Sequence, residues 1–115
     1  MKEVKQKILN RDIGEIEFCE YENGILNGLR EIKCGHKPSV KAFYCDGKLH
    51  GIYESWYDNG QQHVKCYFEK GQYHGEYVSW WKNGNVKEKG EYKQGKKVST
   101  YEWYNQDGHL INSYK

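Results

Sequence analysis

The histidines and cysteines are the residues best suited to hold a metal ion, and their spacing argues against a shared site. His50 and His74 are 24 residues apart, and each precedes a glycine. On successive units of a repeating sheet, their side chains would lie roughly 9–10 Å apart, about two strand spacings. Zinc needs each nitrogen at about 2.0–2.1 Å, so a structural role in a turn explains both histidines better. Cys34 and His36 form the only close Cys/His pair and have no evident third ligand. We expect neither a metal nor another cofactor.

Catalysis would require an activated nucleophile or a pair of acids in unequal environments. Cys19 and Cys66 have no His–Asp pair placed to activate a thiol. They occupy a repeat position shared with Ala42 and Gly90, which indicates small buried side chains. An acidic run alternates mainly with apolar residues, as on a solvated strand face: Glu15, Glu17, Glu20 and Glu22. P-loop, dinucleotide-binding and GxSxG patterns are absent from the sequence. We expect a protein that is not an enzyme.

The chain is rich in aromatic side chains, and these are its clearest candidates for binding residues. It contains 4 Trp, 11 Tyr and 3 Phe, and Tyr and Trp are the residues most often found as binding hot spots. A single curled sheet cannot bury both of its faces, so some rings should stay accessible to a partner protein. The alternative is that the sheet curls enough to stack the rings on one another as a scaffold. The candidate partner-binding residues are Tyr53, Tyr57, Tyr77, Trp81, Tyr101 and Trp103.

A lysine-rich segment offers a second kind of binding site. Beside aromatic residues, such a segment could bind an anionic lipid head group or a single-stranded nucleic acid. Lysines on the edge of a sheet also protect against aggregation, and we favour this protective role for the segment. The lysines concerned are Lys82, Lys87, Lys89, Lys93, Lys96 and Lys97.

A 24-residue repeat positions all of these side chains. GKLHGIYESWYDNG (Gly47–Gly60) aligns without gaps with GQYHGEYVSWWKNG (Gly71–Gly84) and with GKKVSTYEWYNQDG (Gly95–Gly108). Tyr44, Phe68 and Tyr92 coincide in the same frame, and a degraded unit lies upstream. A period of this length indicates an architecture in which each unit packs mainly on its neighbours. The structural repeat positions are Gly47, Gly51, Trp56, Gly60, Gly71, Gly75, Trp80, Gly84, Gly95 and Gly108.

Alternation within each unit predicts two strands and two turns. In Ile52–Tyr57, Tyr53 and Tyr57 share one face, and Ile52 and Trp56 share the other. Asp-Gly and Asn-Gly pairs mark tight turns between the strands. We therefore predict an all-β fold, an elongated and twisted antiparallel meander of about four hairpin repeats. Residues 1–13 form an arm or a first strand, and residues 14–115 form one domain with units at about 14–37, 38–61, 62–85 and 86–115.

The amino-acid composition bears on whether the chain is ordered and on where in the cell it lies. Leu, Ile, Val and Phe total only 21 of 115 residues, which is typical of disorder, but the net charge of +2 is too small to hold the chain open. The aromatic residues can supply the missing core. No apolar stretch approaches the length of a membrane span and no signal peptide is evident, so we expect a cytoplasmic protein with reduced cysteines.

The repeat resembles a known family. GKLHGIYESWYDNGQ (Gly47–Gln61) and GQYHGEYVSWWKNGN (Gly71–Asn85) resemble the MORN repeat, in the variant form of YwqK-type antitoxin proteins and of MORN-like proteins of bacteria and giant viruses. The resemblance covers roughly residues 14–115. It implies a non-enzymatic protein-binding module, of the antitoxin or immunity type, that neutralises a partner protein. A scaffold, or a homo-oligomer joined at its sheet edges, is the remaining alternative.

Overall fold

The computed structural model describes residues 2–98 and 100–114, and its described residues form strands, turns and loops without a helix. The strands are β1 (Lys2–Asn10), β2 (Glu15–Glu22), β3 (Ile25–Cys34), β4 (Lys37–Cys45), β5 (Lys48–Trp56), β6 (Gln62–Glu69), β7 (Gln72–Tyr73), β8 (Gly75–Trp80), β9 (Val86–Lys93), β10 (Lys96–Lys97), β11 (Tyr101–Tyr104) and β12 (Leu110–Tyr114). Residues 2–10, for which the sequence allowed an arm or a strand, thus form a strand.

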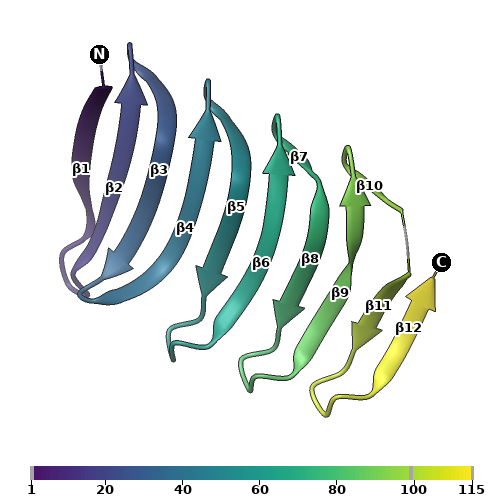
Figure 1. Cartoon of the computed structure of the whole chain (residues 1–115). Coiled ribbons are helices and arrows are strands. Elements are labelled where there is room, and N and C mark those ends of the chain that lie inside the picture. Colours follow the sequence, from purple (N-terminus) through teal and green to yellow (C-terminus); the bar gives the residue numbers. More distant parts are fainter. Residues whose placement is uncertain (1, 99, 115) are drawn as a thin grey trace.

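All 12 strands belong to one antiparallel sheet whose order follows the chain. The path runs from β1 to β12, with the short β7 paired to β6 and the short β10 paired to β9. The two ends of the chain therefore lie at opposite ends of an open sheet (Figure 1). This confirms the predicted all-β antiparallel meander.

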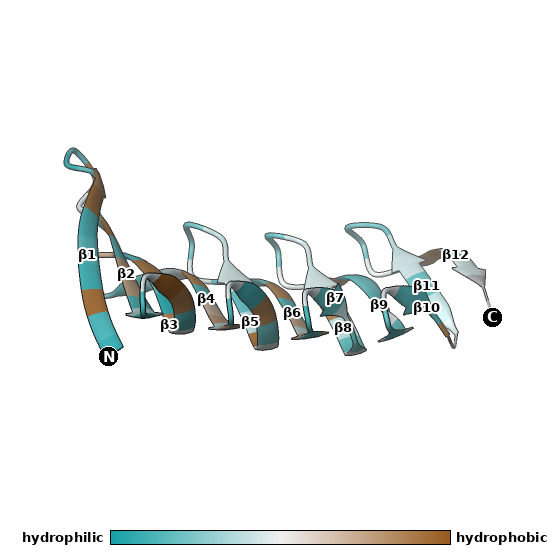
Figure 2. Ribbon diagram, turned by 90° about the horizontal axis from the view of Figure 1, so that it is seen from above, coloured by the Kyte–Doolittle hydropathy of each residue, from teal (hydrophilic) through white to brown (hydrophobic). Residues whose placement is uncertain are grey.

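The sheet is a single layer. Its dimensions are 46 × 34 × 14 Å, and a view along the strands shows one layer of ribbon with nothing stacked on either face (Figure 2). The accessible surface is 7560 Å², against roughly 6,600 Å² for a compact monomer of this mass. The described residues include no helix of the length and apolar character that crossing a membrane requires. Most globular domains cover a sheet face with a second layer, and here both faces stay open.

Two kinds of turn join the strands. At one end, Asp46 and Gly47 connect the paired residues Cys45 and Lys48, and both turn residues have positive φ. Positive φ at both positions defines a type I′ turn, whose twist matches that of the flanking strands. At the other end, Asn59-Gly60 and Asn83-Gly84 lie in wider loops, each closed by a backbone hydrogen bond such as that from Tyr57 N to Gln61 O. The tight turns that the sequence predicts at the Asn-Gly and Asp-Gly pairs of residues 59–60, 83–84 and 107–108 are therefore parts of longer loops.

Alternation along the strands divides the side chains between two faces. One row crosses the middle of the sheet and alternates small with large side chains; in order it contains Cys19, Arg30, Ala42, Tyr53, Cys66, Tyr77, Gly90 and Tyr101. The small members Cys19, Ala42 and Cys66 are buried, as the repeat alignment predicts. A small side chain leaves room for the large one on the neighbouring strand, so the single layer packs along its own surface.

The four cysteines are free thiols in very different settings. Cys45 is exposed, whereas burial raises the pKa of the Cys66 thiol to about 12. We expect an aromatic disulfide reagent at pH 8 to modify Cys45 first and Cys66 only after unfolding, because the thiolate is the reacting species. Mass spectrometry of the labelled peptides over time checks the order. Labelling of Cys66 as fast as Cys45 would contradict it.

Candidate functional site

The most concentrated group of functional side chains is a set of stacked rings on one face of β5 to β11. We call this surface the aromatic face; its members are Tyr53, Phe68, Tyr73, Tyr77, Tyr92, Tyr101 and Trp103. Successive ring centroids lie 4.7 Å apart for Phe68 and Tyr73 and 4.9 Å apart for Tyr73 and Tyr92. Offset-stacked and edge-to-face rings at such distances attract one another. The rings therefore stack, and most of them also remain partly exposed.

Tyr101 is the best-buried ring of this face, with 0% of its surface exposed. Gly90 lies beneath it on the neighbouring strand: a Cβ atom there would overlap Cδ2 of the Tyr101 ring and lie 2.7 Å from Cγ. Tyr92 crosses Tyr101 edge-on with ring centroids 5.7 Å apart, and Trp103 lies beside it at 4.7 Å. Of the predicted binding residues, Tyr101 is thus placed as packing rather than as contact surface.

Polar groups contact Tyr101 at one end of the aromatic face. The Tyr101 hydroxyl donates a hydrogen bond to Glu88 Oε2 at 2.7 Å. Burial, together with hydrogen bonds to Tyr92 and Glu88, raises the pKa of the Tyr101 phenol far above its usual range. Lys97 Nζ lies 4.8 Å from the centre of the Tyr101 ring, within cation–π range. The phenol therefore stays protonated and acts as a hydrogen-bond donor within the fold.

Two of the predicted binding residues, Tyr57 and Trp81, lie in the wide loops and bond to the last residue of the strand that precedes the next wide loop. The Tyr57 hydroxyl donates to Trp80 O at 2.7 Å, and Trp81 Nε1 donates to Tyr104 O at 3.0 Å. Asn59 makes the equivalent bond to Lys82 O. Tyr57 and Tyr53, predicted to share a face, are therefore separated by the end of β5. These bonds give both residues a structural role between neighbouring loops.

Replacing Trp81 with phenylalanine is expected to lower the free energy of unfolding by about 0.5–1.5 kcal/mol. The change removes one hydrogen bond to a partly buried carbonyl, and such bonds contribute about that much. Trp80→Phe is the matched control, because Trp80 is equally half-buried and its indole makes no hydrogen bond to any described residue. Urea unfolding followed by circular dichroism measures both variants. Equal losses would show that the bond to Tyr104 adds nothing.

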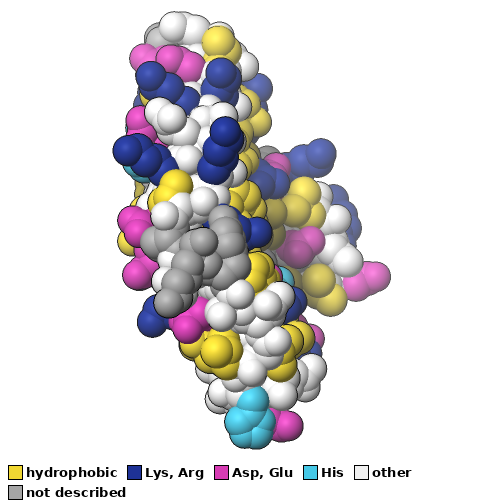
Figure 3. All heavy atoms as spheres, turned by 90° about the vertical axis from the view of Figure 1, so that its right-hand side faces the viewer, with side chains coloured by type: hydrophobic (Ala, Val, Ile, Leu, Met, Phe, Trp, Pro, Cys, Tyr) yellow, Lys and Arg dark blue, Asp and Glu magenta, His cyan; other side chains and the backbone are white. Residues whose placement is uncertain are grey.

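The six candidate lysines are distributed over three places. Lys82 forms an ion pair with Asp58 at 2.7 Å, and Lys87 Nζ lies 4.7 Å from the centre of the Trp81 ring. Lys97 lies on the aromatic face. The other three project from the opposite face, in β9 and β10: Lys89, Lys93 and Lys96. Seen from the β12 end, basic side chains are interspersed with acidic and apolar ones (Figure 3).

The histidines hold turns together. His50 Nδ1 accepts a hydrogen bond from Lys70 N, and His74 Nδ1 accepts one from Gln94 N. His50, in β5, and His74, between β7 and β8, thereby each bond to the turn of the next hairpin. No group of three or more potential ligands is arranged for a metal in the part of the chain that the structure describes. Comparison with protein-family models, curated proteins and solved structures finds no match.

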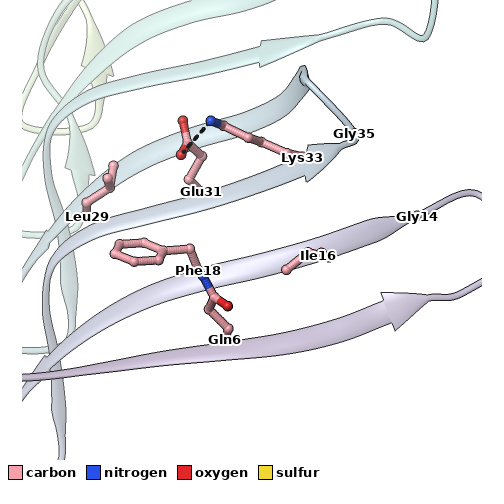
Figure 4. A pocket seen from close by; sticks show the side chains of 8 residues that line it. All are labelled: Gln6, Gly14, Ile16, Phe18, Leu29, Glu31, Lys33 and Gly35. Atoms are coloured by element: carbon pink, nitrogen blue, oxygen red, sulfur yellow. Dashed lines mark ion pairs between the residues drawn. The ribbon is translucent and has the colours of Figure 1, made fainter.

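A pocket on the face opposite the aromatic one was not anticipated from the sequence. It lies over β1, β2 and β3, has a volume of about 350 Å³, and is lined by Gln6, Gly14, Ile16, Phe18, Leu29, Glu31, Lys33 and Gly35 (Figure 4). Phe18 and Leu29 form its apolar floor, and Lys33 and Glu31 make an ion pair of 3.6 Å at its side. The sequence signal was an alternation of apolar residues with the acidic run of β2.

Proposed function

We propose that this protein is a non-enzymatic, protein-binding module whose partner covers the open sheet. The single-layer architecture is the observation that carries this proposal. A sheet only 14 Å thick leaves the aromatic face without a second layer, and partly exposed Tyr and Trp rings are the side chains that contribute most to protein interfaces. A partner would supply the missing layer.

The finer proposal is that about four MORN-like units build this sheet and that the protein acts as an antitoxin or immunity protein in the cytoplasm. Its support is the resemblance of the sequence, together with hydrogen bonds that recur between positions 23 residues apart, from Tyr57 to Trp80 and from Trp81 to Tyr104. Binding of anionic lipid or nucleic acid through the lysine-rich segment is less well supported, because Lys82 and Lys87 already contact Asp58 and Trp81.

Co-expression with the products of neighbouring reading frames tests the proposal. Tyr73 and Tyr67 form a matched pair, since each is 38% exposed but they lie on opposite faces: Tyr73 stacks within the aromatic face, and Tyr67 pairs with Ile52 on the other. We expect one product to be toxic alone, to be neutralised by this protein and to co-purify with it. Tyr73→Ala should weaken that binding by roughly tenfold or more, and Tyr67→Ala should not.

Both variants are first shown to melt like the wild type. Equal affinity of Tyr73→Ala and the wild type for the partner would overturn binding through the aromatic face. Absence of any neutralised or bound product would overturn the antitoxin proposal itself. Binding instead to anionic vesicles or oligonucleotides, with a steep loss of affinity as salt rises, would favour the lysine-rich segment.

A further inference from the structure

Strand β1 presents an open edge. It pairs with β2 on one side, and no strand of the described residues pairs with its other side. All nine residues of β1 are exposed. Along such an edge, the N–H and C=O groups of alternate residues point outward and can pair with an added strand. Partner proteins commonly bind a sheet in this way.

The two faces of β1 differ in chemistry. Lys5 and Lys7 pair in register with Cys19 and Glu17, so they project on the side of the sheet that carries the aromatic face. Val4 and Ile8 project on the opposite side, where they are 55% and 50% exposed. Gln6 lies between them and lines the pocket over β1 to β3. Glu3 also lies on the lysine side, two residues before Lys5. The middle of that side is therefore cationic, and the other side is apolar at Val4 and Ile8 and adjoins an apolar pocket.

The lysines on the cationic side of β1 have no carboxylate partner in the described chain. Glu17 stands opposite Lys7 in the neighbouring strand, but its carboxylate is held by Arg30 at 2.7 Å. Within the described chain, Lys7 makes no ion pair of its own. Lys5 Nζ lies over the Tyr21 ring at 4.9 Å from its centre and likewise meets no carboxylate. An acidic side chain on an added strand would lie directly opposite each lysine.

We propose that the free edge of β1 accepts an extended segment of the partner protein in which acidic and apolar side chains alternate. Acidic side chains two residues apart would face Lys5 and Lys7. The apolar side chains that alternate with them would pack beside Val4, Gln6 and Ile8 and continue the lining of the pocket toward Ile16 and Phe18. This inference rests on the proposed protein-binding function and names the chemistry of the segment that is bound.

A second copy of the chain fits this edge less well. Antiparallel pairing of two β1 strands over all nine residues sets residue 2 opposite residue 10, and therefore Lys5 opposite Lys7 twice. Like charges directly opposite one another destabilise a strand pair. The lysines that disfavour pairing of two β1 strands favour pairing with an acidic strand. The same two residues therefore protect the edge against self-association and select the partner.

Titration with synthetic peptides tests the proposal. The probe is a peptide of nine residues, the length of β1, that alternates glutamate with valine; a lysine–valine peptide and a glutamate–valine peptide with a central proline are the controls. We expect only the first to bind the wild-type chain and to slow hydrogen exchange of β1 amides. The double variant Lys5→Glu/Lys7→Glu should bind it roughly tenfold more weakly and bind the lysine peptide instead.

Lys93→Glu/Lys96→Glu is the matched control, because it makes the same change in charge at two exposed residues far from β1. Equal weakening by the two double variants, or binding without protection of β1, would overturn strand addition at this edge. A β1-dependent dimer in light scattering would overturn it in favour of a second copy. A native partner that binds the Lys5→Glu/Lys7→Glu variant at full affinity would overturn this inference and leave the proposed function standing.

Discussion

Replacing Tyr101 with alanine is expected to lower the free energy of unfolding by about 3–5 kcal/mol, the range measured for large aromatic residues in protein cores. The ring is completely buried and contacts Gly90, Tyr92 and Trp103. Its loss leaves a cavity that a single layer cannot close from above. The hydrogen bond from the hydroxyl to Glu88 is lost as well. For a domain of this size, the melting temperature should fall by roughly 10–25 °C.

The loss should be local to one end of the sheet. Each strand contacts mainly its neighbours, so the destabilisation falls first on β9, β11 and β12. Hydrogen exchange resolved by residue should show faster opening there than in β2 to β5. Tyr101→Phe separates the two contributions, because it keeps the ring and removes only the bond to Glu88. A Tyr101→Ala chain that melts within a few degrees of the wild type would show that the ring is peripheral.

Trp80 illustrates what sequence could predict and what it could not. The repeat frame placed Trp56 and Trp80 at one structural position. The structure leaves both half-buried on the face opposite the aromatic one. Period-two alternation shows which residues share a face, but it does not show which face is better covered. That depends on how neighbouring side chains fit, as Gly90 beneath Tyr101 demonstrates.

The aromatic face was predictable in part. Tyr44, Phe68 and Tyr92 coincide in the repeat alignment, and Phe68 and Tyr92 do join the stack with Tyr73. Tyr57 and Trp81 were misplaced onto that face because the strands end before them, in loops whose width is set by asparagine side chains: Asn59 Oδ1 accepts a hydrogen bond from Gln61 N. The open edge of β1 and the neighbouring pocket could hardly be predicted from the sequence, because residues 2–10 mix charged side chains with few apolar ones.

Alanine at position 90 is expected to lower the free energy of unfolding by about 1–3 kcal/mol, the usual cost of overpacking. The φ angle of Gly90 lies outside the left-handed region, so the backbone tolerates alanine and the cost comes from the added Cβ against the Tyr101 ring. Cys66→Ala is the control. Cys66 is buried at the equivalent position one repeat earlier, and its replacement removes atoms rather than adding them.

A double-mutant cycle tests this prediction directly, because the effect of Gly90→Ala on the free energy of unfolding should change sign when the Tyr101 ring is absent. Once Tyr101→Ala has removed the ring, Gly90→Ala no longer meets an obstacle. It should then be neutral or stabilise by about 0.4–1 kcal/mol, since alanine restricts the unfolded chain more than glycine does. Denaturant unfolding of the four chains measures the coupling. If Gly90→Ala costs the same with and without the Tyr101 ring, the fit of a tyrosine over a glycine does not hold β9 and β11 together, and the sheet is not packed at Tyr101 by the alternation of small and large side chains.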